Sequence, residues 1–156
     1  MKTLQFSTDI RANRQAVWDT MLAPDTYRLW TADFAEGSYY EGAWEQGARV
    51  RFLGPSGDGM VAEVAKCRPP EFLSLKHLGF VKDGVEDTES EMVRTWAPAF
   101  ENYTLLDAGL STHLQIDIDI GLAAAGLEEA QAVEVNDDDA DQVELEVHHR
   151  AFDTDK

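Results

Sequence analysis

A predicted hairpin in residues 101–120, whose second arm alternates between apolar and polar side chains, constrains this chain more than any other feature. In the second half of this segment the apolar positions are every other residue, Leu114, Ile116, Ile118 and Ile120. Because successive side chains of a strand point to opposite faces, the pattern predicts a strand with one apolar and one polar face. Asp107 and Gly109 mark the turn of a hairpin. A sheet of such strands requires helices to cover its apolar face.

Further strands are predicted on the same grounds. The segments with alternation or strand-forming residues between turn signals are 4–10, 38–41, 49–53, 60–67 and 72–80. The glycine-rich run 54–59 predicts a hairpin turn. Residues 82–94 are rich in acids, which predicts a solvated loop, and no strand pattern resumes before Glu101. These strands are expected to pair in one antiparallel sheet with a single apolar face.

The alternation also predicts which side chains point inward. In residues 72–80 it directs Leu73, Leu75 and His77 to the apolar face, opposite Ser74 and Lys76. His113 has the parity of the polar residues in its strand, and we expect it to face solvent. His77 is therefore the one histidine expected near the interior.

Two short helices are predicted in residues 10–30, IRANRQAVWDTMLAPDTYRLW. Asn13 is suited to cap the first helix, because its side chain can accept a hydrogen bond from a free amide of the first turn. Pro24 is expected to end that helix, since the residue before a proline is disfavoured in the helical region. Asp25 then caps a second helix that carries Tyr27 and Trp30. Aromatic residues at helical spacing indicate core packing first.

Composition limits the classes of function. A length of 156 residues, 44% of them hydrophobic, suits one domain over residues 1–156 with a core of its own. The net charge of −17 disfavours nucleic acids and anionic membranes as partners. The single cysteine, Cys67, can form no internal disulfide, which favours a reducing, cytoplasmic location. No signal sequence or membrane-spanning segment is predicted.

Several motifs in order resemble the SRPBCC (START-like) superfamily. They are VWDTML, YRLW, GAWEQGARVRF, ENYTL and the final alternating strand. The similarity is greatest to the bacterial homologues of the activator of the Hsp90 ATPase, and it covers roughly residues 3–120. The matched part of the domain is thus 1–121.

This resemblance implies a helix-grip fold of the α+β class. In that fold a curved antiparallel sheet has two short helices after its first strand, and a C-terminal helix covers the concave face and leaves an apolar cavity. Residues 122–156 depart from the family. They hold eleven acidic residues and only Arg150 and Lys156 as bases, in a divergent acidic segment that we expect to include the closing helix.

No catalytic group, metal site or cofactor motif is recognisable in the sequence. His148 and His149 are adjacent and so point in different directions, which disfavours joint metal binding. His77 is interpreted either as a hydrogen-bonded core residue or as a polar or acid–base group in a cavity. The residues predicted to line the cavity are Trp30, Tyr40, Phe52, Leu75, His77, Trp96, Tyr103, Leu105 and Ile116.

Three functions stay open at this point. The first is binding of a small apolar or amphipathic molecule, because a sheet face rich in aromatic and aliphatic residues is typical of ligand cavities. The second is a protein interaction with a chaperone, which the family resemblance implies. The third is an enzyme of the cyclase or hydrolase kind found elsewhere in the superfamily, for which His77 is the one candidate group.

Overall fold

A single antiparallel sheet organises the part of the chain that the computed structural model describes, residues 2–32 and 35–120. Its eight strands run in the order β1-β8-β7-β5-β4-β3-β2, and β6 pairs with β5. The elements are β1 (Lys2–Ile10), α1 (Arg14–Leu22), α2 (Pro24–Ala32), β2 (Tyr39–Gly42), β3 (Arg49–Leu53), β4 (Gly59–Arg68), β5 (Phe72–Lys82), β6 (Val85–Asp87), α3 (Glu91–Arg94), β7 (Ala99–Asp107) and β8 (Thr112–Ile120).

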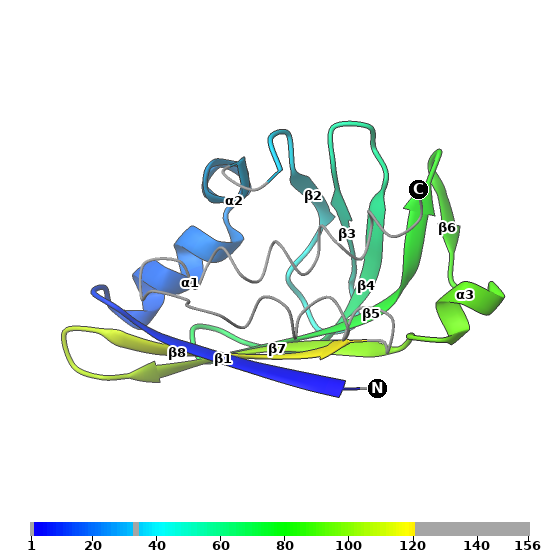
Figure 1. Ribbon diagram of the computed structural model, residues 1–156. Coiled ribbons are helices and arrows are strands. Elements are labelled where there is room, and N and C mark those ends of the chain that lie inside the picture. Colours follow the sequence, from blue (N-terminus) through cyan, green and yellow to red (C-terminus); the bar gives the residue numbers. More distant parts are fainter. Residues whose placement is uncertain (1, 33–34, 121–156) are drawn as a thin grey trace.

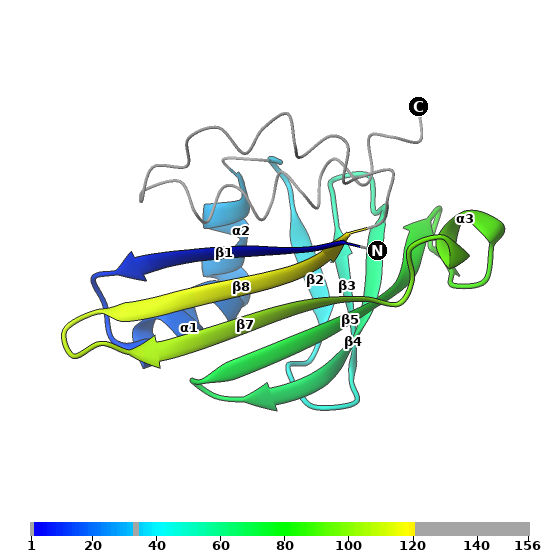
Figure 2. The same ribbon diagram turned by 60° about the horizontal axis from the view of Figure 1, so that its bottom comes forward.

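The sheet is strongly curved. Figure 1 shows β1, β8 and β7 forming one arm of the bend and β2, β3 and β4 rising steeply from it, with α1 and α2 inside the bend. Figure 2 shows β1, β8, β7, β5 and β4 side by side. The predicted α+β fold with a curved antiparallel sheet is confirmed. The predicted closing helix, like His148 and His149, lies outside the described residues.

Local sequence signals explain the two helices between β1 and β2. The Asn13 side chain accepts a hydrogen bond from the Ala16 backbone N–H at 2.8 Å, as the capping prediction required. The first helix ends at Leu22, and Pro24 begins α2, where its missing N–H would have no helical partner anyway. Asp25 is not the cap that the sequence predicted but lies in the first turn of α2, where its charge suits the helix dipole.

The core lies where α1 meets the concave face of the sheet. Val17, Trp18 and Leu22 of α1 are buried there against strand residues. The predicted alternation in β8 is confirmed, because Leu114, Ile116 and Ile118 are all buried. The strand residues of this cluster are Val50, Val64, Leu73, Leu75, Tyr103, Leu105, Leu114, Ile116 and Ile118.

Three expectations are corrected. Residues 82–94 are not simply a loop, since they contain β6 and α3, and the Ser90 hydroxyl caps α3 by accepting from Val93 N–H at 3.3 Å. β7 begins at Ala99 rather than at Glu101. The sheet also has apolar residues on both faces, because pairing of β3, β4 and β5 brings Leu53, Val61 and Val81 together on the face opposite Val50.

Burial on that second face reaches residues that alternation alone assigned to solvent. Ser74 is only 6% exposed, although the sequence placed it on the polar face. Among residues 2–32 and 35–120, every helix is too short and too polar to cross a membrane.

Candidate functional site

A buried polar network lies on the concave face, between β5 and β7. His77 Nε2 is 2.7 Å from Glu101 Oε2, and the Tyr103 hydroxyl donates a hydrogen bond to Glu101 Oε1. His77 is 4% exposed and Glu101 is 1% exposed. Burial of a polar side chain is costly unless hydrogen bonds compensate it, and here both carboxyl oxygens of Glu101 take part in one. The direction of the His77–Glu101 hydrogen bond depends on which of the two groups carries the proton.

Pairing of the two strands explains why these side chains meet. Glu101 is the register partner of Leu75, and His77 is the partner of Ala99, so the two polar residues are diagonal neighbours on one face. Tyr103 follows Glu101 by two positions and therefore points to the same face. The sequence predicted the inward position of His77 and missed Glu101. The available signal was its phase, because Glu101 alternates with Tyr103 and Leu105, both predicted as inward.

A series of aromatic rings leads to this network. We call Tyr27, Trp30, Tyr40, Trp44 and Phe52 the aromatic row. Ring centroids are 5.3 Å apart for Tyr27 and Trp30, 5.0 Å for Tyr27 and Tyr40, 5.0 Å for Tyr40 and Trp44, and 6.0 Å for Trp44 and Phe52. The Phe52 ring is in turn 5.9 Å from the His77 ring. These spacings are typical of edge-to-face and tilted aromatic contacts. The row connects α2 to the polar network.

The end of α1 fixes two rings of the aromatic row. The carbonyl oxygen of Leu22 accepts hydrogen bonds from the Tyr40 hydroxyl and, at 3.1 Å, from Trp44 Nε1. The carbonyl oxygens in the last turn of a helix receive no hydrogen bond from an N–H of the same helix. The two side-chain donors therefore satisfy an oxygen that would otherwise need water. The polar atoms of Tyr40 and Trp44 are thereby used for structure.

A cavity of about 160 Å³ lies beside α1. Its lining is mainly apolar and includes Ile10, Val17, Thr20, Met21, Trp30 and Leu114. Trp30 belongs to both the cavity and the aromatic row. The indole N–H of Trp30 is buried, and no hydrogen-bond acceptor contacts it among the described residues.

The structure brings together most of the residues predicted to line a cavity. Leu75, Tyr103, Leu105 and Ile116 are buried in the core cluster, and His77 is buried beside them. Tyr40 and Phe52 are partly buried and pack against that cluster.

Trp96 lies in different surroundings. Its ring packs on Phe80, with the centroids 5.0 Å apart, and it is not among the described residues of the core cluster. Trp44 was not predicted as a site residue, and Tyr27 was expected only at the rim of the pocket beside Trp30. Their positions in the aromatic row depend on contacts between α2, β2 and β3, which no local pattern reports.

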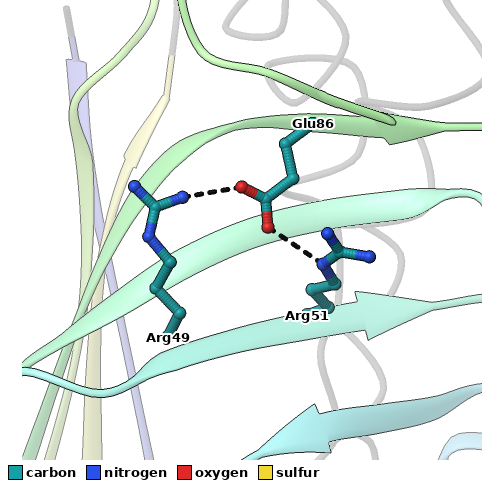
Figure 3. Close-up of polar contacts among 3 residues, drawn as sticks. All are labelled: Arg49, Arg51 and Glu86. Atoms are coloured by element: carbon teal, nitrogen blue, oxygen red, sulfur yellow. Dashed lines mark hydrogen bonds and ion pairs between the residues drawn. The ribbon is translucent and has the colours of Figure 1, made fainter. Parts of the chain in front are cut away.

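Charged side chains gather on the opposite face of the sheet. Arg49 Nη1 is 2.7 Å from Glu86 Oε2, and Arg51 Nε is 2.9 Å from Glu86 Oε1. Figure 3 shows the two guanidinium groups reaching from β3 toward this one carboxylate of β6. All three residues are at least partly exposed, so the cluster contributes little stability. Within the described ranges, no three His, Cys, Asp or Glu side chains are grouped as a metal site would require.

Comparison with known proteins supports the fold. No protein-family model matches the chain, and no curated protein sequence does so. The Aha1 dimer from Colwellia psychrerythraea, a solution structure, has a TM-score of 0.59 at 16% identity and covers 85% of this chain and 90% of its own. An HSP90 activator from Plasmodium falciparum has a TM-score of 0.57 at 10% identity, over 85% of this chain and 89% of its own.

A third structure covers still more of this chain. It is a protein from Rhodobacter sphaeroides with a TM-score of 0.56 at 20% identity, over 96% of this chain and 93% of its own. The described elements thus define an α+β protein that shares the fold of these structures. Its structural neighbours include an HSP90 activator and Aha1, and at these identities the likeness is one of fold.

Proposed function

We propose that this protein binds a small amphipathic molecule on the concave face of its sheet. The observation that carries the proposal is the placement of the buried His77–Glu101–Tyr103 network at the end of the aromatic row. Ligand sites in proteins are mostly apolar and contain a few convergent polar groups that fix the orientation of the ligand. In this proposal the aromatic row contacts the apolar body of the ligand, and His77 orients its polar end.

The burial of His77 and Glu101 limits how a ligand can reach them. His77 and Glu101 are almost inaccessible, so a ligand that reaches them has to displace neighbouring side chains. The carboxylate of Glu101 keeps the His77 ring oriented through the 2.7 Å contact, and Tyr103 holds the carboxylate in turn. Such an oriented imidazole discriminates between ligands with and without a hydrogen-bonding group at that end.

The test uses three apolar or amphipathic probes: lauric acid, the flavonoid naringenin and the dye 1-anilinonaphthalene-8-sulfonate. At least one probe is expected to bind saturably and to raise the melting temperature. His77→Gln should weaken that binding by about tenfold, the effect of losing one hydrogen bond. His113→Gln is the matched control, because His113 Nδ1 makes a similar contact of 2.8 Å to Asp9 on an exposed surface.

Two results would end the proposal. One is the absence of saturable binding for all three probes, together with no carried-over molecule in native mass spectrometry. The other is equal loss of affinity in His77→Gln and His113→Gln, which would assign no special role to the buried network. If a bound probe is chemically changed during the titration, the network acts as an acid–base group in an enzyme rather than only as a binding group.

A second candidate is stimulation of a chaperone ATPase. It is favoured by the fold shared with an HSP90 activator from Plasmodium falciparum and with Aha1 from Colwellia psychrerythraea. Fold alone does not determine function, so the assay has to be direct. The ATPase rate of purified bacterial Hsp90 would be measured with increasing amounts of this protein. A rate that stays constant up to a tenfold molar excess would dismiss this candidate.

A further inference from the structure

The cavity beside α1 has the size of a single ring. Its volume is about 160 Å³. An engineered apolar cavity of about 150 Å³ in another protein stays dry and takes up benzene. The lining here is also mainly aliphatic, with Ile10, Val17, Met21 and Leu114 among its residues. A compact uncharged molecule with one ring fits this space.

One polar group sets this cavity apart from a purely apolar one. Trp30 is part of the lining, and its buried Nε1–H has no acceptor among the described residues. Trp44 in the same aromatic row does have one, the carbonyl oxygen of Leu22 at 3.1 Å. A buried donor without an acceptor is costly, and an occupant that brings an acceptor atom removes that cost.

Other groups in the lining limit the occupant further. Thr20 contributes a hydroxyl group, and none of the lining residues carries a charge. The mainly apolar lining offers few hydrogen-bond partners to water. A charged ligand would be left without a counter-charge there.

We propose that this cavity is a binding subsite for an uncharged single-ring molecule that carries an acceptor oxygen, such as an aryl ketone. The Trp30 indole N–H donates to that oxygen, and the aliphatic residues of α1, β1 and β8 surround the ring. The inference is independent of the proposed function, because the two sites share only Trp30 and the subsite uses neither His77 nor Glu101.

The experiment compares acetophenone with ethylbenzene on the full-length protein. Both molecules carry a two-carbon substituent on a benzene ring, and only acetophenone has an acceptor oxygen. Both are titrated into ¹⁵N-labelled protein, and the indole N–H resonances of the four tryptophans are followed. Acetophenone is expected to bind about tenfold more tightly than ethylbenzene. It should also shift the Trp30 indole proton downfield, whereas ethylbenzene should not.

Two variants give the matched comparison. Trp30→Phe keeps a ring against Tyr27 but removes the donor, so the preference for acetophenone should disappear. Trp96→Phe removes another buried indole N–H that lacks an acceptor among the described residues but does not line the cavity, and the preference should persist. If Trp30→Phe does not fold, the wild-type affinities and the Trp30 resonance still decide the question.

The overturning results are specific. Equal affinities of the two probes with an unmoved Trp30 resonance would exclude the proposed hydrogen bond. Absence of saturable binding by both probes would exclude the subsite, as would a Trp30 N–H found to donate to bound water. None of these results bears on His77→Gln, so the outcome separates this subsite from the proposed function.

Discussion

Apolar replacement of the His77–Glu101 pair, one residue at a time and then together, provides the sharpest test of the buried network. His77→Phe keeps a planar ring beside Phe52, and Glu101→Leu keeps a side chain of similar size. Each single change leaves one buried polar group without the partner that lies 2.7 Å away. The double change removes both of these polar groups and leaves only the Tyr103 hydroxyl without its acceptor.

The expected magnitudes follow from the burial of the pair. Removing one partner of a buried hydrogen-bonded pair leaves the other partner unsatisfied and costs about 1–3 kcal/mol of unfolding free energy, whereas replacing both partners by apolar residues costs less. The double variant should therefore lose less stability than the sum of the two single variants, by about 1–3 kcal/mol. Since a domain is stable by only about 5–15 kcal/mol, the single variants should show clearly lower urea midpoints.

The assay is urea unfolding followed by circular dichroism for the four members of the cycle. Asp9 and His113 form the control cycle, with Asp9→Leu and His113→Phe. Their contact distance of 2.8 Å is nearly the same, but their side chains are 74% and 36% exposed. An exposed pair should give a coupling energy below about 1 kcal/mol. Equal coupling energies in the two cycles would refute the argument that burial makes the His77–Glu101 pair strong.

Three further predictions concern the edge of the sheet and the thiol. Gly79→Ala should lower the free energy of unfolding by about 1–3 kcal/mol, because a Cβ there would lie 1.9 Å from the Asp87 carbonyl oxygen. Gly54→Ala is the control in the same urea assay and should be tolerated, because its Cβ would meet nothing closer than 3.8 Å. Hydrogen bonds from Ser90 lower the pKa of Asp87. The ionised Asp87 therefore stabilises the turn before α3 at pH values above the usual carboxyl pKa, and this stabilisation is lost as the pH falls through the lowered pKa. The Ser90 amide resonance should report this transition in the native protein and not in Asp87→Asn. Burial raises the pKa of the Cys67 thiol, so iodoacetamide at pH 8 should react with it more slowly than with the urea-unfolded chain; equal rates would contradict this.

Local patterns in the sequence accounted for much of the fold. The alternation in residues 114–120, the Asn13 cap and the break before Pro24 predicted a strand and two helices that the structure contains. The prediction failed for residues 82–94, where many acidic residues concealed β6 and α3. The three residues of β6 form a strand because they pair with β5, and a pairing partner is not a local property.

The candidate site also has a part that the sequence predicted and a part that it did not. Sequence parity by itself determined that His77, Leu75 and Tyr103 face inward, because the side-chain period of a strand is a local geometric property. Only the tertiary structure decided that Glu101, 24 residues away, lies 2.7 Å from His77. It also decided that Trp30 contributes an indole N–H to a cavity lined by α1, β1 and β8. Those contacts depend on strand register and on how α1 and α2 lie inside the bend of the sheet, which only packing between distant segments determines.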